Sequence, residues 1–253
     1  MPARRTQLPA FTLVEIMVSL GVLAILIGIL VPALAKARDR SRELASAVNL
    51  RSIGQLFAVY TASSRDMYPA GVPGISYPTN PPGFAKTIAH WSSVDEWPFL
   101  FAGTHPWWEY ERLYLAPGAV REQLDAGPVY PVPKPSFDYA SSFLAHPGLW
   151  APDRNIPTDQ IANLERSVTQ SMVRFPASKV LMWDIEMPYL RRPLQRDERY
   201  NLLERTPMLF ADQHIANHIP ADATPAITNP APTAARLHEN LHNTPNGVHG
   251  RDY

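Results

Sequence analysis

The 253-residue chain contains no cysteine, so disulfide bonds, thiol catalysis and cysteine-based zinc sites are excluded. It also has no charge excess, because 23 Lys and Arg residues balance 23 Asp and Glu residues. A general electrostatic attraction to nucleic acid needs a clear basic excess, so we expect no nucleic-acid partner. The length suits one domain of ordinary size, or one domain with an appendage.

Proline, in contrast, is abundant. The chain has 27 prolines, and most of them follow residue 65. Proline removes a backbone hydrogen-bond donor and favours turns and the edges of sheets. We therefore expect the C-terminal part of the chain to consist of turns, irregular loops and short strands.

A long uncharged segment lies near the N-terminus. Residues 16–35 carry no charge, and about 20 apolar residues let a helix cross the hydrocarbon core of a bilayer. A basic leader with Arg4 and Arg5 precedes the segment, and charge returns at Lys36. We therefore predict a transmembrane helix over residues 14–35.

Two general interpretations of this segment are open. A plain signal anchor requires only the apolar length. A cleaved secretory signal is indicated by residues 33–35 (Ala-Leu-Ala), which form an A-x-A cleavage site, although the apolar run exceeds the roughly 7–15 residues of a normal secretory segment. The pair Arg4 and Arg5 suggests a twin-arginine signal, but residues 6–9 (Thr-Gln-Leu-Pro) do not support one well.

Glu15 points to a third interpretation, because a carboxylate within an apolar segment is costly and indicates a function with a specific partner. The stretch AFTLVEIMVSLGVLAILIGILVPAL resembles the processing and methylation segment of type IV prepilins and type II secretion pseudopilins. In those families a small residue, normally glycine, precedes Phe-Thr-Leu-x-Glu and a long apolar helix. Here Ala10 takes the small position, and Phe11 to Glu15 follow in register.

The resemblance implies specific processing and assembly steps. Prepilin peptidase, a membrane enzyme, would cut between Ala10 and Phe11 and methylate the new amine of Phe11. Glu15 would then neutralise the terminal amine of a neighbouring subunit during assembly. The spacing from Phe11 to Glu15 also places the two residues on one helix face. The alternative for Glu15 is an uncharged or solvated carboxylate in the headgroup layer.

The helix is expected to continue beyond the membrane. Apolar residues recur at spacings of three and four, which predicts an amphipathic helix packed on a core; they are Ala47, Leu50, Ile53, Phe57 and Tyr60. The stretch NLRSIGQLFAVYTASSRDMYP further resembles a bacterial pseudopilin-like group with an H-X9-DG-type C-terminal region. In that group the helix ends before a Tyr/Phe-Pro pair, which here is Tyr68-Pro69.

Later segments predict short elements. WPFLFAG reads as a strand and HPWWEYERLYL as a short helix, while residues 178–186 (SKVLMWDIE) form a β-rich apolar run. Residues 206–218 (TPMLFADQHIANH) predict a strand, a turn and a second strand. The same group carries a turn of the form F-A-D-G-H, and Gln213 replaces its glycine, which leaves the geometry of this hairpin open.

HENLH, at His238–His242, matches the H-E-x-x-H zinc pattern. On a helix this pattern places two imidazoles on one face, with Glu239 as general base. A proline- and alanine-rich stretch precedes it, and His249, the only nearby third ligand, misses the metzincin spacing by one residue. We interpret these histidines as solvent-exposed residues of a terminal turn, and we expect no metal site.

Two further ligand sites are possible. Asp184, Glu186, Asp212 and His214 would surround a calcium ion if the fold brought them together, as in some pseudopilins, although no EF-hand loop is present. Aromatic clusters also bind sugars, but they more often form a core. We favour the core for the four tryptophans of the central region, Trp91, Trp97, Trp107 and Trp108.

The sequence therefore predicts a pilin-like α+β protein. Residues 1–10 form a basic leader and residues 11–63 a long helix, half of it transmembrane. Residues 64–253 form a periplasmic domain with a small antiparallel sheet and proline-rich loops. The positive-inside rule alone places this domain in the cytoplasm, because more Lys and Arg follow the span than precede it; the resemblance places it in the periplasm.

The function implied by the resemblance is structural. We expect a pseudopilin-like subunit of the inner membrane, with prepilin peptidase and other pseudopilin subunits as partners, and with no cofactor and no catalytic residue. It would assemble into a type II secretion pseudopilus or a type IV pilus-like filament. The alternatives are a signal-anchored or secreted zinc hydrolase that uses HENLH, and an anchored sugar-binding module that uses Trp107.

Overall fold

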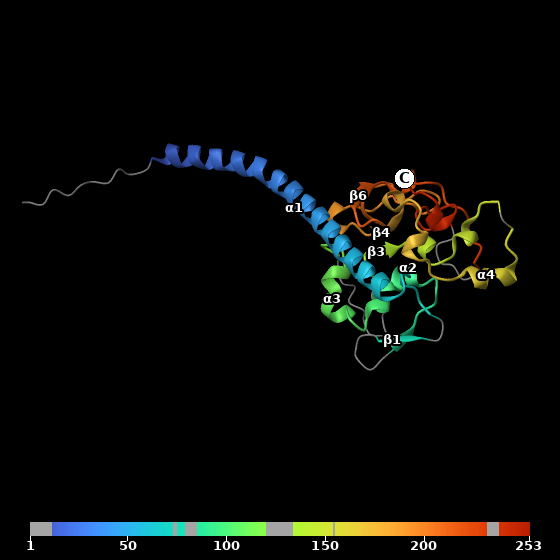
Figure 1. The fold of residues 1–253 in the computed structure, drawn as a ribbon. Helices are drawn as coiled ribbons and strands as arrows, with labels where there is room; N and C mark the ends of the chain where they lie inside the picture. Colours follow the sequence, from blue (N-terminus) through green and yellow to red (C-terminus); the bar gives the residue numbers. More distant parts are fainter. Residues whose placement is uncertain (1–11, 73–74, 79–84, 120–133, 154, 232–237) are drawn as a thin grey trace, which may run out of the picture. The chain divides into compact units, whose positions relative to one another are not determined.

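The computed structural model describes residues 12–72, 75–78, 85–119, 134–153, 155–231 and 238–253. The chain divides into two compact units, residues 1–41 and 42–253. Helix α1 (Leu13–Ser63) begins in the first unit and ends in the second (Figure 1). The first unit contributes apolar helix, and every strand assigned in the described residues belongs to the second unit.

The part of α1 in the second unit shows the predicted amphipathic pattern. Leu50, Ile53 and Phe57 are fully buried, at spacings of three and four residues. Residues that face away from them, including Leu44 and Val48, are exposed. This stripe confirms that the helix packs on a core, and the burial of apolar area stabilises the contact by about 25 cal/mol per Å².

The sheet of the second unit has four antiparallel strands in the order β3-β4-β5-β6. A separate two-stranded sheet pairs β1 with β2 (Figure 1). The strands are β1 (Ser76–Pro78), β2 (Ala85–Thr87), β3 (Phe137–Tyr139), β4 (Val180–Asp184), β5 (Thr206–Phe210) and β6 (Ile215–His218). The predicted strand after residue 178 and the predicted hairpin after residue 206 are therefore confirmed.

Short helices and turns connect these strands. The α-helices are α2 (Ser93–Glu96), α3 (Trp107–Tyr114) and α4 (Thr158–Leu164), and α3 confirms the short helix predicted for HPWWEYERLYL. The 3₁₀ helices are η1 (Trp97–Phe101), η2 (Ser141–Phe143), η3 (Pro147–Trp150), η4 (Gln170–Met172), η5 (Pro176–Ser178), η6 (Pro188–Leu190), η7 (Pro220–Asp222) and η8 (Gly247–His249).

The strand predicted for WPFLFAG is wrong, because this segment forms η1. Pro98 stands in the first turn of η1, where its fixed φ suits a helix and its missing N–H removes no intrahelical bond. The same arrangement recurs at the starts of η3, η5, η6 and η7. Five of the 27 prolines thus start short helical turns.

The register of the sheet separates its two faces. Tyr139, Met182 and Leu209 lie opposite one another on neighbouring strands and therefore share one face. Phe57 of α1 contacts this face through Tyr139, with 5.1 Å between ring centroids. Asp138 and Trp183 are likewise opposite each other, on the second face. β4 is buried along its whole length because both faces of the sheet are covered.

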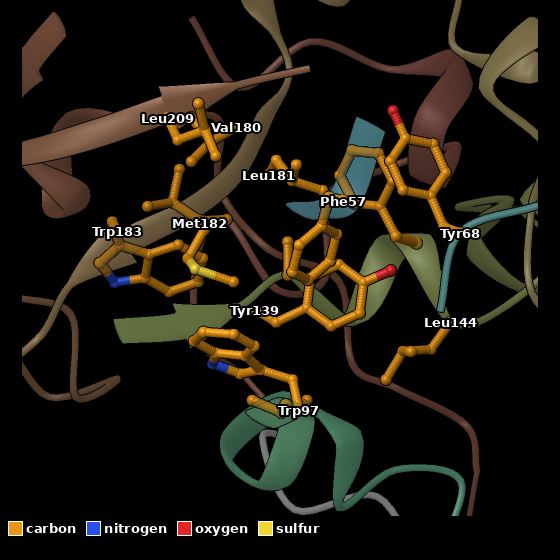
Figure 2. Close-up of a cluster of buried hydrophobic side chains, with 14 of the residues drawn as sticks. Phe57, Tyr68, Trp97, Tyr139, Leu144, Val180, Leu181, Met182, Trp183 and Leu209 are labelled. Atoms are coloured by element: carbon orange, nitrogen blue, oxygen red, sulfur yellow. The ribbon is translucent and has the colours of Figure 1, made fainter. Parts of the chain in front are cut away.

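Aromatic rings fill the space between α1 and the sheet. Figure 2 shows Phe57 beside Tyr139, with Trp97 on the neighbouring helical turn and Met182 on β4. The Phe57 ring centroid lies 5.8 Å from that of Trp97 and 5.2 Å from that of Phe101. Both rings are tilted relative to Phe57, and these centroid distances are typical of favourable aromatic pairs, which add to the stabilisation from buried area.

Candidate functional site at the start of the long helix

Two of the three predicted processing and assembly residues, Ala10 and Phe11, lie outside the described residues. Glu15 is described, in the first turn of α1. Its Oε2 accepts hydrogen bonds from the backbone N–H of Thr12 at 2.8 Å and from the Thr12 hydroxyl at 2.9 Å. The backbone N–H of Glu15 donates to the Thr12 hydroxyl oxygen at 3.3 Å.

This reciprocal arrangement is a capping box. The N-cap Thr12 bonds the N–H three residues later, and Glu15 reaches back to the N–H of Thr12. The pattern T-x-x-E is legible in the sequence, but sequence reasoning concentrated on the charge of Glu15 and missed it. Glu15 therefore has a local role, because it satisfies backbone donors that no helical carbonyl can reach.

Capping does not exhaust the hydrogen-bonding capacity of Glu15. Both Thr12 donors reach the same oxygen, Oε2, whereas an ionised carboxylate offers about four acceptor positions on two oxygens. An amine one helical turn away can therefore bond to Glu15 without breaking the cap. Phe11, whose amine the sequence predicts as a partner, precedes Glu15 by four residues and lies outside the described residues.

The segment that follows is fit to cross a membrane by length and composition. The large apolar side chains of residues 13–34 are 49–74% exposed. Ser19, the one polar uncharged side chain in the run, donates to the carbonyl oxygen of Glu15 at 2.7 Å. Its hydroxyl is thus satisfied within the helix, as hydrocarbon requires.

A buried carboxylate joins the second part of α1 to the sheet. Asp184, at the end of β4, is fully buried, and its Oδ2 accepts from the hydroxyls of Ser46 at 2.6 Å and Tyr189 at 3.1 Å. Its Oδ1 accepts from the backbone N–H groups of Glu186 at 3.0 Å and Met187 at 2.9 Å. Burial raises the pKa of Asp184, and these four donors oppose the rise.

The calcium site considered for Asp184, Glu186, Asp212 and His214 is not formed. The pairing of β4 with β5 places Asp184 beside Thr206, whose hydroxyl donates to its carbonyl oxygen. Asp212 and His214 lie at the turn after β5, which adjoins the other end of β4. Among the described residues, no group of three or more His, Cys, Asp or Glu is placed to hold a metal ion.

HENLH forms a turn and not a helix, since Leu241 has a left-handed backbone with φ of 66°. His238 is exposed and lies 3.3 Å from the Thr228 hydroxyl. His242 is fully buried, so the interpretation of both histidines as solvent-exposed is wrong for this one. The two imidazoles therefore do not share a helix face, as the zinc pattern requires.

His242 covers the second face of the sheet. Its Nδ1 accepts the N–H of Ser141 at 3.4 Å, and its ring packs on Trp183 with 4.6 Å between centroids. Nε2 lies 3.5 Å from Oδ2 of Asp138. Both ring nitrogens thus face groups of strand β3 and the turn after it, and the buried imidazole holds the C-terminal segment against the sheet.

Three of the four tryptophans of the central region confirm the core interpretation, which is wrong for the exposed Trp108. Trp91, Trp97 and Trp107 are 0–7% exposed, whereas Trp108 is 37% exposed. Trp107 stacks on Tyr114 with 5.3 Å between ring centroids. A sugar-binding platform needs an open aromatic face, and these three rings do not offer one.

A buried ion pair escaped sequence reasoning. Lys179 and Asp252 are fully buried, with 3.1 Å between Nζ and Oδ1. Lys179 Nζ also donates to the Thr244 hydroxyl at 2.5 Å, and Asp252 Oδ2 accepts the N–H of Val180 at 2.8 Å. Burial lowers the pKa of Lys179, and the Asp252 carboxylate opposes this fall. The pair fastens the last residues of the chain to β4.

Comparison of the chain with protein-family models, with curated proteins and with solved structures finds no significant match. The resemblance of residues 10–15 to a prepilin-type segment therefore rests on the sequence motif alone. What the fold shows is coarser: an apolar N-terminal helix long enough to span a membrane, and an α+β unit with a small antiparallel sheet.

Proposed function

We propose that the protein is a pseudopilin-like structural subunit, held in the inner membrane by the first part of α1 and assembled into a filament outside the cytoplasm. One observation carries the proposal. Glu15 stands in the first turn of an apolar, membrane-length helix, one helical turn after the Phe11 that the prepilin-type motif marks as the mature N-terminus. The role of such a subunit is helix packing, with no catalytic residue and no cofactor.

The two parts of α1 support this proposal in different ways. Residues 13–34 present an exposed apolar surface, which suits contact with lipid before assembly and with neighbouring helices after it. Residues 42–63 pack on the sheet through Leu50, Ile53 and Phe57. One continuous helix thus contains both an apolar segment that suits a membrane and a segment that packs on the sheet of the domain.

The mass of the mature N-terminus tests the proposed processing. In a host with prepilin peptidase, we expect the first tryptic peptide to begin with methylated Phe11. A mature chain that begins at Lys36 would identify a cleaved secretory signal and overturn the proposal. Retention of Met1 in the presence of active peptidase would identify a plain signal anchor.

The residue before the proposed cleavage site provides a matched set of variants. Ala10→Gly restores the residue usual in the family and should be processed at least as fast as the natural chain. Ala10→Leu places a bulky side chain there and should leave the precursor uncut. Complete maturation of the Ala10→Leu chain would show that a different bond is cleaved.

Variants of Glu15 separate its charge from its capping role. Glu15→Gln keeps an oxygen acceptor for Thr12 and removes the charge, whereas Glu15→Ala removes both. If the charge binds a neighbouring amine, both variants lose assembled filaments while Glu15→Gln retains the helix start. If the Glu15→Gln chain gives as much filament in sheared fractions as the natural chain, the charge of Glu15 is not needed for assembly and its role is helix capping.

A further inference from the structure

The segment between β4 and β5 is a folded loop rich in arginine. We call residues 187–205 the arginine loop. It has its own small apolar cluster, in which Met187, Tyr189 and Leu202 are 1–2% exposed. An isolated bridge pairs Arg196 with Leu202. The loop therefore has a defined structure that can present side chains in a fixed arrangement.

Charges are sorted by sign within the arginine loop. Two of its three acidic residues bond to the backbone of the loop itself: the buried Glu204, 7% exposed, accepts the N–H of Gln195, and the half-buried Asp197 accepts the N–H groups of Arg199 and Asn201. All of its arginines are exposed, namely Arg191, Arg192, Arg196, Arg199 and Arg205. The outer surface of the loop thus carries five guanidinium groups, of which Arg192 pairs with Glu204 at 3.2 Å, against the exposed Glu198 and the half-buried Asp197.

Apolar side chains stand among these arginines. Tyr200 is 69% exposed and Leu203 is 43% exposed. Tyr200 has a left-handed backbone with φ of 66°, which is costly for a bulky residue. Arg196 Nη1 donates to the Tyr200 carbonyl oxygen at 2.8 Å. The loop thus holds an aromatic ring outward at a conformational cost, beside cationic groups.

The ends of the arginine loop lie beside the first turns of α1 in the second unit. Tyr189 and Ser46 both donate to Oδ2 of Asp184. At the other end, Arg205 donates to the carbonyl oxygen of Asn217, whose amide donates to Glu43. Glu43 follows Ala35, the last residue of the uncharged run, by eight residues, which reach at most about 28 Å.

We propose that the arginine loop is a binding surface for anionic phospholipid headgroups. Guanidinium groups match the geometry of phosphate, and tyrosine favours the membrane interface. The inference rests on the proposed membrane anchor, because tethering raises the effective concentration of lipid at the loop. An acidic protein would also attract the arginines, but the exposed apolar side chains of Leu203 and Tyr200, together with the covalent tether to the proposed anchor, favour a lipid surface.

A fluorophore placed on the loop tests this inference in the full chain. The chain has no cysteine, so Leu203→Cys gives a single site for an environment-sensitive dye. The labelled chain is reconstituted in vesicles of phosphatidylcholine alone, or with phosphatidylglycerol. We expect a blue shift and a rise in emission only with phosphatidylglycerol, and a reversal at high salt. A dye on Val72→Cys, which is also exposed and lies outside the loop, should not respond.

Charge variants then show whether the arginines are responsible. Replacing Arg196 and Arg199 with glutamine should weaken the lipid-bound state about fivefold per residue, seen as a higher phosphatidylglycerol content at half-maximal shift. Lysine at both positions should restore most of the response. Arg174→Gln, which removes an exposed arginine outside the loop, should leave the response unchanged.

Three results would overturn the inference, and they differ. If the chain incorporates into both kinds of vesicle but the dye emission does not depend on lipid charge, the membrane anchor is supported and the arginine loop does not bind anionic lipid. A response in neutral vesicles to soluble polyglutamate, without a response to phosphatidylglycerol, assigns the loop to an acidic protein. Failure to incorporate into either vesicle removes the membrane anchor and this inference together.

Discussion

Asp184 allows the sharpest prediction about the junction between α1 and the sheet. Asp184→Ala leaves four donors without their acceptor: two hydroxyls, from Ser46 and Tyr189, and two backbone N–H groups. A buried donor left unsatisfied costs about 1–3 kcal/mol, while removal of a buried charge offsets part of this cost. We expect a loss of about 3–5 kcal/mol in the free energy of unfolding, comparable to the loss from breaking a buried pair.

Asp184→Asn is the matched control. Its amide oxygen can still accept from the two backbone N–H groups, and the hydroxyls of Ser46 and Tyr189 can rotate to accept from the amide nitrogen. We therefore expect this variant to lose only about 1–2 kcal/mol. Natural domains have about 5–15 kcal/mol in total, so the two variants should differ clearly.

Denaturant unfolding of the full chain in detergent measures both values. Tryptophan fluorescence suits this measurement because Trp183 precedes Asp184 in β4. A shift in midpoint at constant m-value reports a change in stability alone. If Asp184→Ala costs less than about 1 kcal/mol, or if alanine and asparagine cost the same, the carboxylate does not hold the helix to the sheet.

Four further predictions concern other parts of the second unit. Lys179→Met leaves Asp252 buried without its partner and should cost about 3–5 kcal/mol of unfolding free energy in denaturant titrations. Burial lowers the pKa of Lys179 from 10.5, so the unfolded chain binds this proton more tightly than the folded chain. The free energy of unfolding should therefore rise as pH rises from the folded pKa toward 10.5. Lys179→Met should abolish this rise. Gln213→Gly relieves a φ of 74° and should raise stability by about 0.5 kcal/mol, seen in thermal unfolding. His238→Ala should leave the zinc content of the purified chain, measured by mass spectrometry of metals, unchanged.

The elements that the sequence predicts well are those with strong local periodicity. The helical stripe through Leu50, Ile53 and Phe57 repeats over several turns, and β4 and the β5–β6 hairpin are apolar runs bounded by turn residues. Strand β3, at Phe137–Tyr139, has only three residues and is defined by its pairing with β4. Such a short element carries little periodicity of its own, so it escapes prediction.

Residues whose role depends on the folded sheet are the ones that sequence reasoning misplaces. His242 is buried because the register puts Asp138 and Trp183 on the face that the C-terminal segment covers. Lys179 and Asp252 are 73 residues apart in the chain, and neither has a local signal of partnership. The turn at Gln213 keeps the left-handed backbone expected of glycine, so in this case the fold overrides the preference of the residue.

The two parts of α1 are stabilised by different means, so the proposed assembly can be tested separately from the stability of the domain. The first part satisfies its own polar groups, through the capping box of Thr12 and Glu15 and through the bond from Ser19 to a helical carbonyl. The second part depends on the sheet, through Asp184 and the aromatic core. A helix segment that needs no partner for its polar groups can exchange lipid for neighbouring helices without loss of hydrogen bonds.

This separation predicts a crossed result for two variants. Glu15→Gln should reduce filament assembly and leave the unfolding midpoint of the domain unchanged. The side-chain hydrogen bonds described for Glu15 join it to Thr12 and not to the sheet. Asp184→Asn should lower the midpoint and still allow processing at Phe11. The two measurements are sheared-filament yield and denaturant unfolding, made on the same preparations. A Glu15→Gln chain with a lowered midpoint would show that the start of α1 is coupled to the fold of the domain.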